Sequence, residues 1–424
     1  SDFEASVGMS RKWNAREAGR EVAENTLKNL KHDPSFFLLF STIHYDDHGG
    51  LQEFLDGVWE ILPKDTPLVG GTVSGFVNND GCYTRGACAL AVSYPNIDIS
   101  VAVGKNTKRN PKKAVKTCYR KIKKDLGDSI FENKILFNFI SGPSIPQLPL
   151  IGKINTIESK FVGNFLAYIG MRISSFAGYG VGKEEEIIDE MSSLFKDFHI
   201  IGGSTIDDGK MYYNYQFFGK EIFKKSMVCL GICIDRLFFL DGDIGLNPTD
   251  INFDITKTTS NGRIITRINK KPAKKILFDI FGLSEHVFRD LDLLYRTTFY
   301  YPLGFHDYND YSTGIGAIAG NNIMIAHSAK SKQAFLYSAT GKDIINTIDK
   351  VLKDYEQEQF NFVFASSCEA RLETLGNKIF NVKEKFDTHF NNLPYLVLYM
   401  GGENIGIPGK TARARIHSFN LLSL

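Results

Sequence analysis

LVGGTVSGFVNNDG, which runs from Leu68 to Gly81, and IIGGSTIDDG, which runs from Ile200 to Gly209, share one pattern. In both stretches an apolar pair is followed by Gly-Gly and then by a hydroxyl residue, and Asp-Gly closes the loop. A strand-like apolar run lies upstream of each copy, at 36–43 and at 134–140. Such similarity within one chain is typical of a duplicated supersecondary unit. We therefore expect two related units in the N-terminal part of the chain.

The two glycine loops are candidate ligand-binding segments. Glycine allows a ligand to approach main-chain N–H groups closely, and a neighbouring hydroxyl group supplies a further polar contact. The candidate residues are Gly70, Gly71, Thr72, Gly202, Gly203 and Ser204. The same glycines are equally suited to tight connections between packed elements. The sequence leaves both interpretations open.

Strand-like runs alternate with amphipathic helical patterns along the chain. One such helix, predicted over residues 50–62, places Leu51, Phe54, Leu55 and Val58 on a single face. Strands interleaved with helices indicate an α/β fold, mixed α+β in detail. We expect duplicated α/β units in residues 1–250, with loops at 68–81 and 200–209. A C-terminal α/β domain is expected to follow in residues 251–424.

The last third of the chain has two strands that end in reactive or charged residues. NFVFASSCEARLETLG delivers Cys368 and Arg371, and YLVLYMGGENIG delivers Gly402 and Glu403. Sites on α/β sheets usually lie at the carboxyl ends of strands. A guanidinium and a carboxylate there could hold the two ends of a zwitterion, or they could pair with each other. Cys368 is either a weak candidate nucleophile or a small buried hydrophobe.

Three other motifs do not predict a cofactor or a metal ion. GYGVGK (178–183) lacks the spacing of a Walker loop and of a dinucleotide fingerprint, so we read it as a turn before a helix. HYDDH (44–48) is followed by Gly-Gly and reads as a polar loop. The lysine-rich stripe of 112–124 is typical of a solvated helix face, with an acidic partner as the alternative.

Composition excludes two broad classes of protein. A net charge of +2 argues against a dedicated nucleic-acid binder. No apolar run reaches the roughly 18 residues that a membrane span needs, so no membrane partner is expected. The six cysteines are scattered and lack zinc-ligand spacing. Reduced thiols of this kind predict a cytoplasmic protein.

The repeated loops together with SSCEARLETLG and GGENIG resemble the FIST family, a predicted sensory module. The resemblance covers nearly the whole chain. VGGTVSG and IIGGSTIDDG belong to the N-terminal FIST region, and NKKPAKKIL (269–277), YPLG (301–304), SSCEARLETLG and GGENIG belong to the C-terminal one. Ala370 stands where the family pattern has glycine, whereas Cys368, Arg371, Gly402 and Glu403 match it. The closing Asn-Thr pattern is only half present, at Asn420. The resemblance implies binding of a small ligand such as an amino acid.

These observations lead to one main functional hypothesis and two alternatives. We expect a stand-alone, non-catalytic signal-transduction module that binds a small molecule and passes the signal to an unidentified protein. The ten candidate ligand contacts are the six loop residues together with Cys368, Arg371, Gly402 and Glu403. The alternatives are a thiol-dependent hydrolase or transferase that uses Cys368, and a protein-interaction adaptor.

Overall fold

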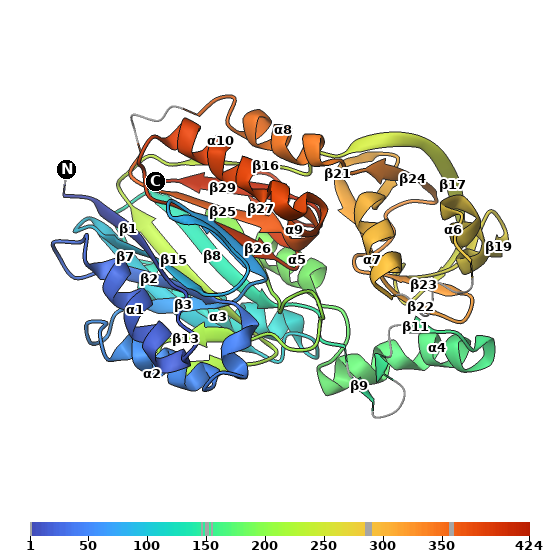
Figure 1. Cartoon of the computed structure of the whole chain (residues 1–424), viewed down its shortest axis with the longest axis horizontal. Coiled ribbons are helices and arrows are strands. Elements are labelled where there is room, and N and C mark those ends of the chain that lie inside the picture. Colours follow the sequence, from blue (N-terminus) through green and yellow to red (C-terminus); the bar gives the residue numbers. More distant parts are fainter. Residues whose placement is uncertain (1, 146, 149–151, 154–155, 285–290, 356–359) are drawn as a thin grey trace.

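The computed structural model describes residues 2–145, 147–148, 152–153, 156–284, 291–355 and 360–424. In these residues, three mixed sheets share one strand order and enclose a common core. Figure 1 shows the sheets on one side of the molecule and a smaller body of strands and helices on the other. The mixed α/β class predicted from the sequence is confirmed.

The first sheet belongs mostly to the N-terminal quarter of the chain. Its order is β1 (Glu4–Ser10), β6 (Ala87–Ser93), β2 (Phe36–Ser41), β3 (Leu68–Thr72), β13 (Gln216–Phe218) and β14 (Glu221–Phe223). Helices α1 (Ala15–Leu27) and α2 (Leu51–Trp59) pack their apolar faces on it. The 3₁₀ helix η1 (Ile43–Asp46) precedes α2 and contains the first part of HYDDH.

The second sheet is built in the same way. Its order is β7 (Ile97–Lys105), β15 (Ser226–Ile234), β8 (Asn133–Ser141), β12 (His199–Thr205), β27 (Glu403–Gly406) and β28 (Arg413–Arg415). Helices α3 (Pro111–Leu126) and α5 (Glu184–Leu194) cover its outer face.

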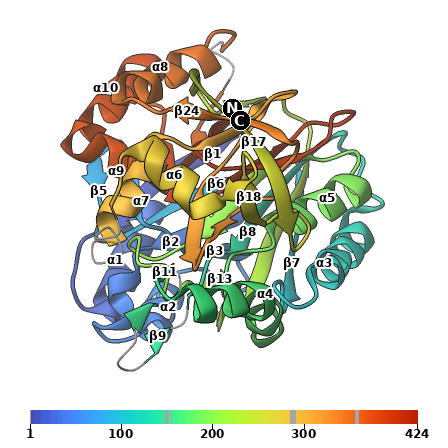
Figure 2. The same ribbon diagram turned by 90° about the vertical axis from the view of Figure 1, so that its right-hand side faces the viewer.

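The third sheet completes the set. Its order is β16 (Phe239–Asp243), β29 (Phe419–Ser423), β25 (Val363–Cys368), β26 (Tyr395–Met400), β4 (Gly75–Asn78) and β5 (Gly81–Tyr83). Helices α8 (Gly341–Val351) and α10 (Phe380–Phe390) pack on it, with α9 (Glu369–Leu375) and the 3₁₀ helix η4 (Gly376–Ile379) between them in sequence. Figure 2 shows the three groups of helices on three sides of the sheets.

Each sheet has a central parallel pair, namely β2 with β3, β8 with β12, and β25 with β26. Each also receives a hairpin from another unit. The β13–β14 hairpin pairs with β3, the β27–β28 hairpin pairs with β12, and the β4–β5 hairpin pairs with β26. The exchange therefore closes in a ring. We call the parts of the chain that supply the central pairs β2–β3, β8–β12 and β25–β26 the first, second and third units.

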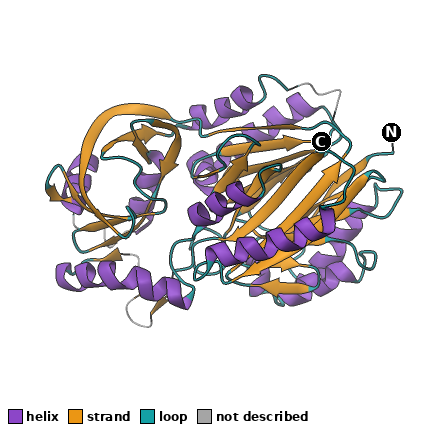
Figure 3. Cartoon of the chain, turned by 180° about the vertical axis from the view of Figure 1, so that it is seen from behind, coloured by secondary structure: helices purple, strands orange, loops and turns teal. Residues whose placement is uncertain are grey.

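Aromatic side chains from the three sheets meet in the common core. Phe40, Phe139 and Phe364 lie on β2, β8 and β25, and all three are fully buried. The ring centroids of Phe40 and Phe139 are 4.9 Å apart, and that of Phe364 is 6.3 Å from Phe139. Edge-on contacts at such distances add to the free energy of burial. Figure 3 shows the strands lying between the helices that surround this core.

The smaller body is an insertion between β16 and α8, joined by a segment from the second unit. Its strands are β17 (Asn247–Thr259), β18 (Ile264–Ile268), β19 (Lys271–Pro272), β20 (Leu303–Phe305), β21 (Tyr308–Thr313), β22 (Ile315–Ala319), β23 (Asn322–Ile325) and β24 (Gln333–Ser338). Its helices are α6 (Ala273–Phe281) and α7 (Leu291–Tyr300). We call residues 247–338 the insert.

Helix α4 (Lys160–Ala177) lies beside the insert, as Figure 1 shows. The short strand β11 (Thr156–Ile157) just before it pairs in parallel with β22, and β9 (Gln147–Leu148) pairs with β10 (Gly152–Lys153). Asn164 on α4 accepts hydrogen bonds from the backbone of Asn321 and the side chain of Asn322. The second unit and the insert are thereby joined.

The expected domain division at residues 250 and 251 lies inside β17. In both the second and the third sheet, strands that precede this boundary lie together with strands that follow it. In the described part of the chain, no helix is both long and apolar enough to span a bilayer.

Candidate functional site

The predicted loop glycines lie in strands that pack closely against other protein atoms. A Cβ atom on Gly70 would lie 1.7 Å from the Leu39 carbonyl oxygen, and one on Gly202 would lie 1.9 Å from that of Asn138. On Gly203 it would lie 2.6 Å from the Gly402 carbonyl oxygen. Glycine in a strand interior often marks such a close backbone approach. Packing therefore accounts for these three glycines without a ligand.

The neighbouring loop residues also contact the protein. A Cβ atom on Gly71 would lie 2.5 Å from the Tyr215 carbonyl oxygen. The Thr72 hydroxyl accepts a hydrogen bond from the Tyr215 N–H at 3.0 Å. The Ser204 hydroxyl donates to Glu184 Oε1 at 2.8 Å. Both hydroxyl groups are buried, and a ligand contact by any of the six loop residues stays a prediction.

Arg371 is a buried structural residue in this geometry. Its guanidinium donates hydrogen bonds to the carbonyl oxygens of Ile244 at 2.6 Å and His417 at 2.8 Å. A longer bond reaches the Ile344 carbonyl oxygen at 3.4 Å. Burial lowers the pKa of Arg371, and the nearby Cys368 and Glu403 oppose that shift. The guanidinium holds three segments of backbone together, which gives it a role other than the predicted binding of a carboxylate.

Glu403 and Cys368 are both buried, and their side chains contact each other. Glu403 Oε2 accepts a hydrogen bond from the Ser418 hydroxyl at 2.7 Å, and burial raises the pKa of the carboxyl to about 8. Burial also raises the pKa of the Cys368 thiol well above its ordinary value, and the charge of Glu403 adds to this shift. A cysteine reacts as a nucleophile through its thiolate. Cys368 is therefore poorly suited to nucleophilic chemistry near neutral pH.

The structure brings some of the predicted residues together. Gly203 and Glu403 are register partners in β12 and β27. The Ser204 N–H donates to the Gly402 carbonyl oxygen at 2.7 Å. The second glycine loop thus lies beside GGENIG, although through strand pairing rather than around an open cavity.

An open cleft of about 580 Å³ lies elsewhere, beside the start of α3. Its wall is dominated by cations, and we call the space between them the basic cleft. The cationic lining residues are Lys108, Arg109, Arg172, Lys183 and Arg263, and the carboxylate among the described lining residues is Glu186. A concave surface lined by one sign of charge concentrates ions of the opposite sign. The basic cleft is therefore suited to an anionic ligand.

Lys108 is the most unusual residue of the basic cleft. Its side chain is only 2% exposed, and within the described residues its Nζ atom has no hydrogen-bond partner. Burial lowers the pKa of Lys108 to about 8, while Glu184 raises it and Lys225 lowers it further. A buried charge without a partner costs folding free energy. Perturbed groups of this kind in a cleft are typical of functional sites.

The fold positions Lys108 through the turn between β7 and α3. Pro111 occupies the first turn of α3, where its missing N–H is tolerated, and Ala114, Val115 and Cys118 bury one face of the helix. The Thr107 N–H donates to the Lys225 carbonyl oxygen at 2.9 Å. These contacts hold the residues before the helix in place, so that Lys108 and Arg109 line the cleft.

Aromatic residues form another part of the cleft wall. Tyr168 and Phe176 on α4 line it, with relative exposures of 70% and 66%. The Arg109 guanidinium lies 4.1 Å from the centroid of the Phe176 ring. A cation over a ring face at this distance is attracted by the ring quadrupole.

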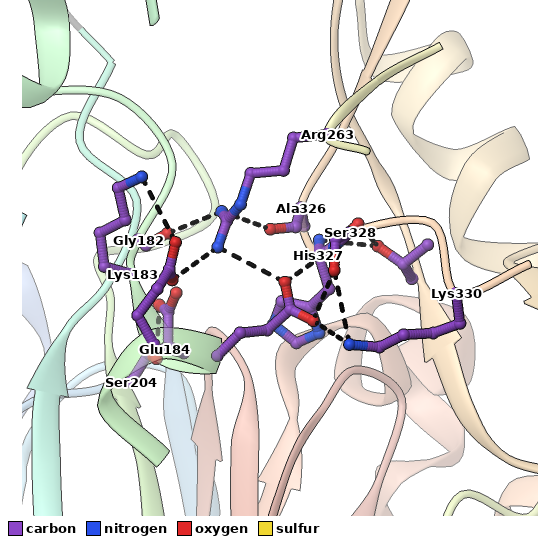
Figure 4. A network of polar contacts seen from close by, with 12 residues as sticks. Gly182, Lys183, Glu184, Ser204, Arg263, Ala326, His327, Ser328 and Lys330 are labelled. Carbon is purple, nitrogen blue, oxygen red and sulfur yellow. Dashed lines mark hydrogen bonds and ion pairs between the residues drawn. The ribbon is translucent and has the colours of Figure 1, made fainter. Parts of the chain in front are cut away.

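Three consecutive glutamates at the start of α5 form polar contacts with the second sheet, the basic cleft and the insert (Figure 4). Glu184 accepts from Ser204 in the second sheet. Glu186 pairs with Arg263 at 2.8 Å and with Lys183 at 3.5 Å, at the cleft itself. Glu185 faces the insert, where it accepts hydrogen bonds from Lys330 and from the Ser328 N–H at 2.7 Å each.

Sequence reasoning did not identify the basic cleft. Its residues come from separated parts of the chain, and only folding brings them together. One local signal was available, because Lys108 and Arg109 lie three and two residues before Pro111 at a helix start, and helix N-termini favour anions. Lys183 of the rejected GYGVGK motif does line the cleft, although in a setting unrelated to a Walker loop.

Comparison with known proteins gives one family and one relative. A model of the FIST N domain matches residues 35–271. An uncharacterised protein of Methanocaldococcus jannaschii, MJ1623, is 24% identical over 387 residues, which are 87% of this chain. The chain spans 66% of the length of that relative.

Among solved structures, a cyanuric acid hydrolase from A. caulinodans is similar over 55% of this chain and 71% of its own. The two are 8% identical, with a TM-score of 0.26. This likeness is too weak to support an argument about fold or chemistry.

Proposed function

Because the chain belongs to the FIST family, whose domains are generally sensory, we propose that it senses a small anionic ligand without catalysing a reaction. The ligand binds in the basic cleft. The observation that carries this proposal is Lys108, a residue of the cleft lining whose Nζ atom is buried and has no hydrogen-bond partner within the described residues. A ligand oxygen would give this ammonium group the partner that the described residues do not provide.

The charge of the basic cleft narrows the class of ligand that we expect. Lys183 and Arg263 already share Glu186, which leaves the other cations of the cleft to attract the ligand. A neutral zwitterion gains little there because its ammonium group is repelled. Among amino acids, an acidic one such as glutamate fits the cleft best. An unidentified signalling protein would receive the signal.

The experiment is a thermal-shift measurement at low ionic strength with glutamate, citrate, inorganic phosphate and phenyl phosphate. At about 100 times its dissociation constant, a ligand stabilises the folded chain by roughly 2.7 kcal/mol. We expect at least one of the four compounds to raise the unfolding midpoint. Lys108→Met should abolish that response, whereas the matched control Lys112→Met, on the exposed side of α3, should retain it.

Alkaline pH provides a second readout. Because burial lowers the pKa of Lys108 to about 8, the charged fraction falls about tenfold for each pH unit above that value. The response should therefore weaken between pH 7 and pH 9.5 in the unmodified chain. A complete lack of response to all four compounds, or an unchanged response in Lys108→Met, contradicts the proposal.

The thiol-dependent alternative has less support. Cys368 is 3% exposed, and its raised pKa disfavours the thiolate. Glu403 lies within hydrogen-bond reach of the thiol, but burial raises the pKa of both groups, which disfavours the thiolate and the carboxylate base together. We therefore do not assign a reaction to this pair.

A further inference from the structure

The basic cleft combines three features that together select a chemical class of ligand: surplus positive charge, unpartnered polar side chains and an exposed aromatic wall. From these we infer that its ligand is a small phosphate monoester that carries an aromatic or heterocyclic group. This inference rests on the proposed function, since it names the class of ligand for the same cleft. The phosphate would lie at Lys108 and the start of α3, and the ring would lie against Phe176.

The first step of the argument is the balance of charge. Glu186 pairs with Lys183 and Arg263, and Arg263 also pairs with Glu185 at 3.5 Å. Within the described residues, Lys108, Arg109 and Arg172 also line the cleft and form no ion pair, so the surplus charge comes from them. A phosphate monoester carries a charge of about −1.5 to −2 at neutral pH, more than a single carboxylate. The dianion therefore compensates the cleft better than a monocarboxylate does.

The second step concerns hydrogen-bond donors. Lys108 and Thr259 both line the cleft, and the Nζ atom of one and the hydroxyl of the other are buried and have no partner within the described residues. Both are donors that ligand oxygens could satisfy. A tetrahedral phosphate has three terminal oxygens and meets them from several directions.

The third step concerns the aromatic wall. Phe176 and Tyr168 expose most of their ring surface beside the cations. The Arg109 guanidinium lies 4.1 Å from the centroid of the Phe176 ring. This contact holds the ring, a flat apolar surface, next to a positive charge. A planar group attached to the phosphate can stack on this surface and bury it. Inorganic phosphate and a methyl phosphate ester have no planar group and cannot stack on this surface.

Calorimetric titration of the full chain with phenyl phosphate, methyl phosphate, benzoate and citrate tests the inference. Phenyl phosphate should bind about tenfold or more tightly than benzoate, because benzoate has the ring without the dianion. It should also bind several-fold more tightly than methyl phosphate. Phe176→Leu should remove the advantage over methyl phosphate and leave methyl phosphate binding unchanged. Lys108→Met should weaken both esters about tenfold or more, and Lys112→Met should weaken neither.

The outcomes separate this inference from the proposed function. If citrate binds in a Lys108-dependent manner and neither ester does, the cleft is an anion site but the phosphate inference is wrong. Equal binding of benzoate and phenyl phosphate also overturns it, as does a Phe176→Leu effect of the same size on both esters. If none of the four compounds binds, both proposals fail. Circular dichroism of each variant shows whether a lost response reflects unfolding instead, in which case Lys108→Gln replaces Lys108→Met.

Discussion

At the scale of single residues, burial decides which of the polar groups can meet a ligand. Arg371 and Lys108 are both about 2% exposed, yet their surroundings differ. Arg371 donates to backbone carbonyl oxygens from three segments, whereas the Lys108 Nζ atom has no partner in the described structure. A satisfied buried cation stabilises a fold. An unsatisfied one at a cleft wall is the better candidate for binding.

Glu403 leads to a prediction about pH. Its folded-state pKa is raised from 4.5 to about 8, mainly by burial, so the folded chain retains a proton that the unfolded chain has lost between these values. The free energy of unfolding should therefore fall with rising pH in this window, by up to about 1.4 kcal/mol per unit from this group. Glu403→Gln, which does not titrate, should show a shallower fall.

Urea unfolding of both proteins at pH 5, 6.5 and 8 measures this difference. Comparing the two slopes removes contributions of other carboxyl groups such as Glu369, whose pKa burial also raises. Parallel slopes would show that Glu403 is ionised in the folded chain at neutral pH. The contribution is fully present below pH 4.5 and is lost as the pH rises through 8.

At the scale of elements, the glycines of β12 allow two units to pack. Gly203 faces the Gly402 carbonyl oxygen, and a Cβ atom there would also lie 2.8 Å from the Met400 sulfur. Both neighbours belong to the third unit, so the glycine permits the close approach of β12 to the segment between β26 and β27. Glycine here serves packing between sheets.

Gly203→Ala should therefore destabilise the chain. The added methyl group meets the Gly402 carbonyl oxygen, a backbone atom that cannot move away independently, and the Met400 side chain. Overpacking of this kind costs typically about 1–3 kcal/mol. Gly341→Ala is the matched control, since the nearest atom to its Cβ would be Leu375 Cδ2 at 3.7 Å, an ordinary contact. Chemical denaturation should give a lower unfolding free energy for Gly203→Ala only. Equal stability of the two variants would contradict the packing role.

At the scale of the whole molecule, the exchanged hairpins tie the units into one structure. The β4–β5 hairpin of the first unit completes the third sheet, while the third unit supplies β27 and β28 to the second. The common core also draws Phe364, Leu396 and Met400 from the third unit. A fragment that contains only one or two of the three units therefore cannot complete the sheets or the core.

A fragment of residues 1–250 should therefore fail to form a stable native structure. It lacks β25 and β26, so the β4–β5 hairpin loses its partner strand, and β12 loses β27 as its neighbour. We expect no near-ultraviolet circular dichroism and no cooperative thermal transition, whereas the full chain should show both. A fragment that unfolds cooperatively would support the domain boundary predicted from the sequence.

The sequence by itself determined the alternation of strands and helices and the mixed α/β class. The Gly-Gly pattern and the apolar runs are local features, and periodicity is set by neighbouring residues. The same local reading placed Cys368, Arg371 and Glu403 at strand ends, where the structure has Cys368 and Glu403. It also identified the FIST family, because the order of short motifs is a property of the chain alone.

Only the tertiary structure decided which polar groups are satisfied and which line a cleft. The hairpin exchange joins residues more than 200 positions apart, such as Asn138 and Asn404, whose side chains hydrogen-bond at 2.8 Å. Lys108, Phe176 and Arg263 likewise meet across three separate segments. Burial and pairing depend on neighbours that are distant in sequence, so local patterns could not distinguish the saturated Arg371 from the unpartnered Lys108.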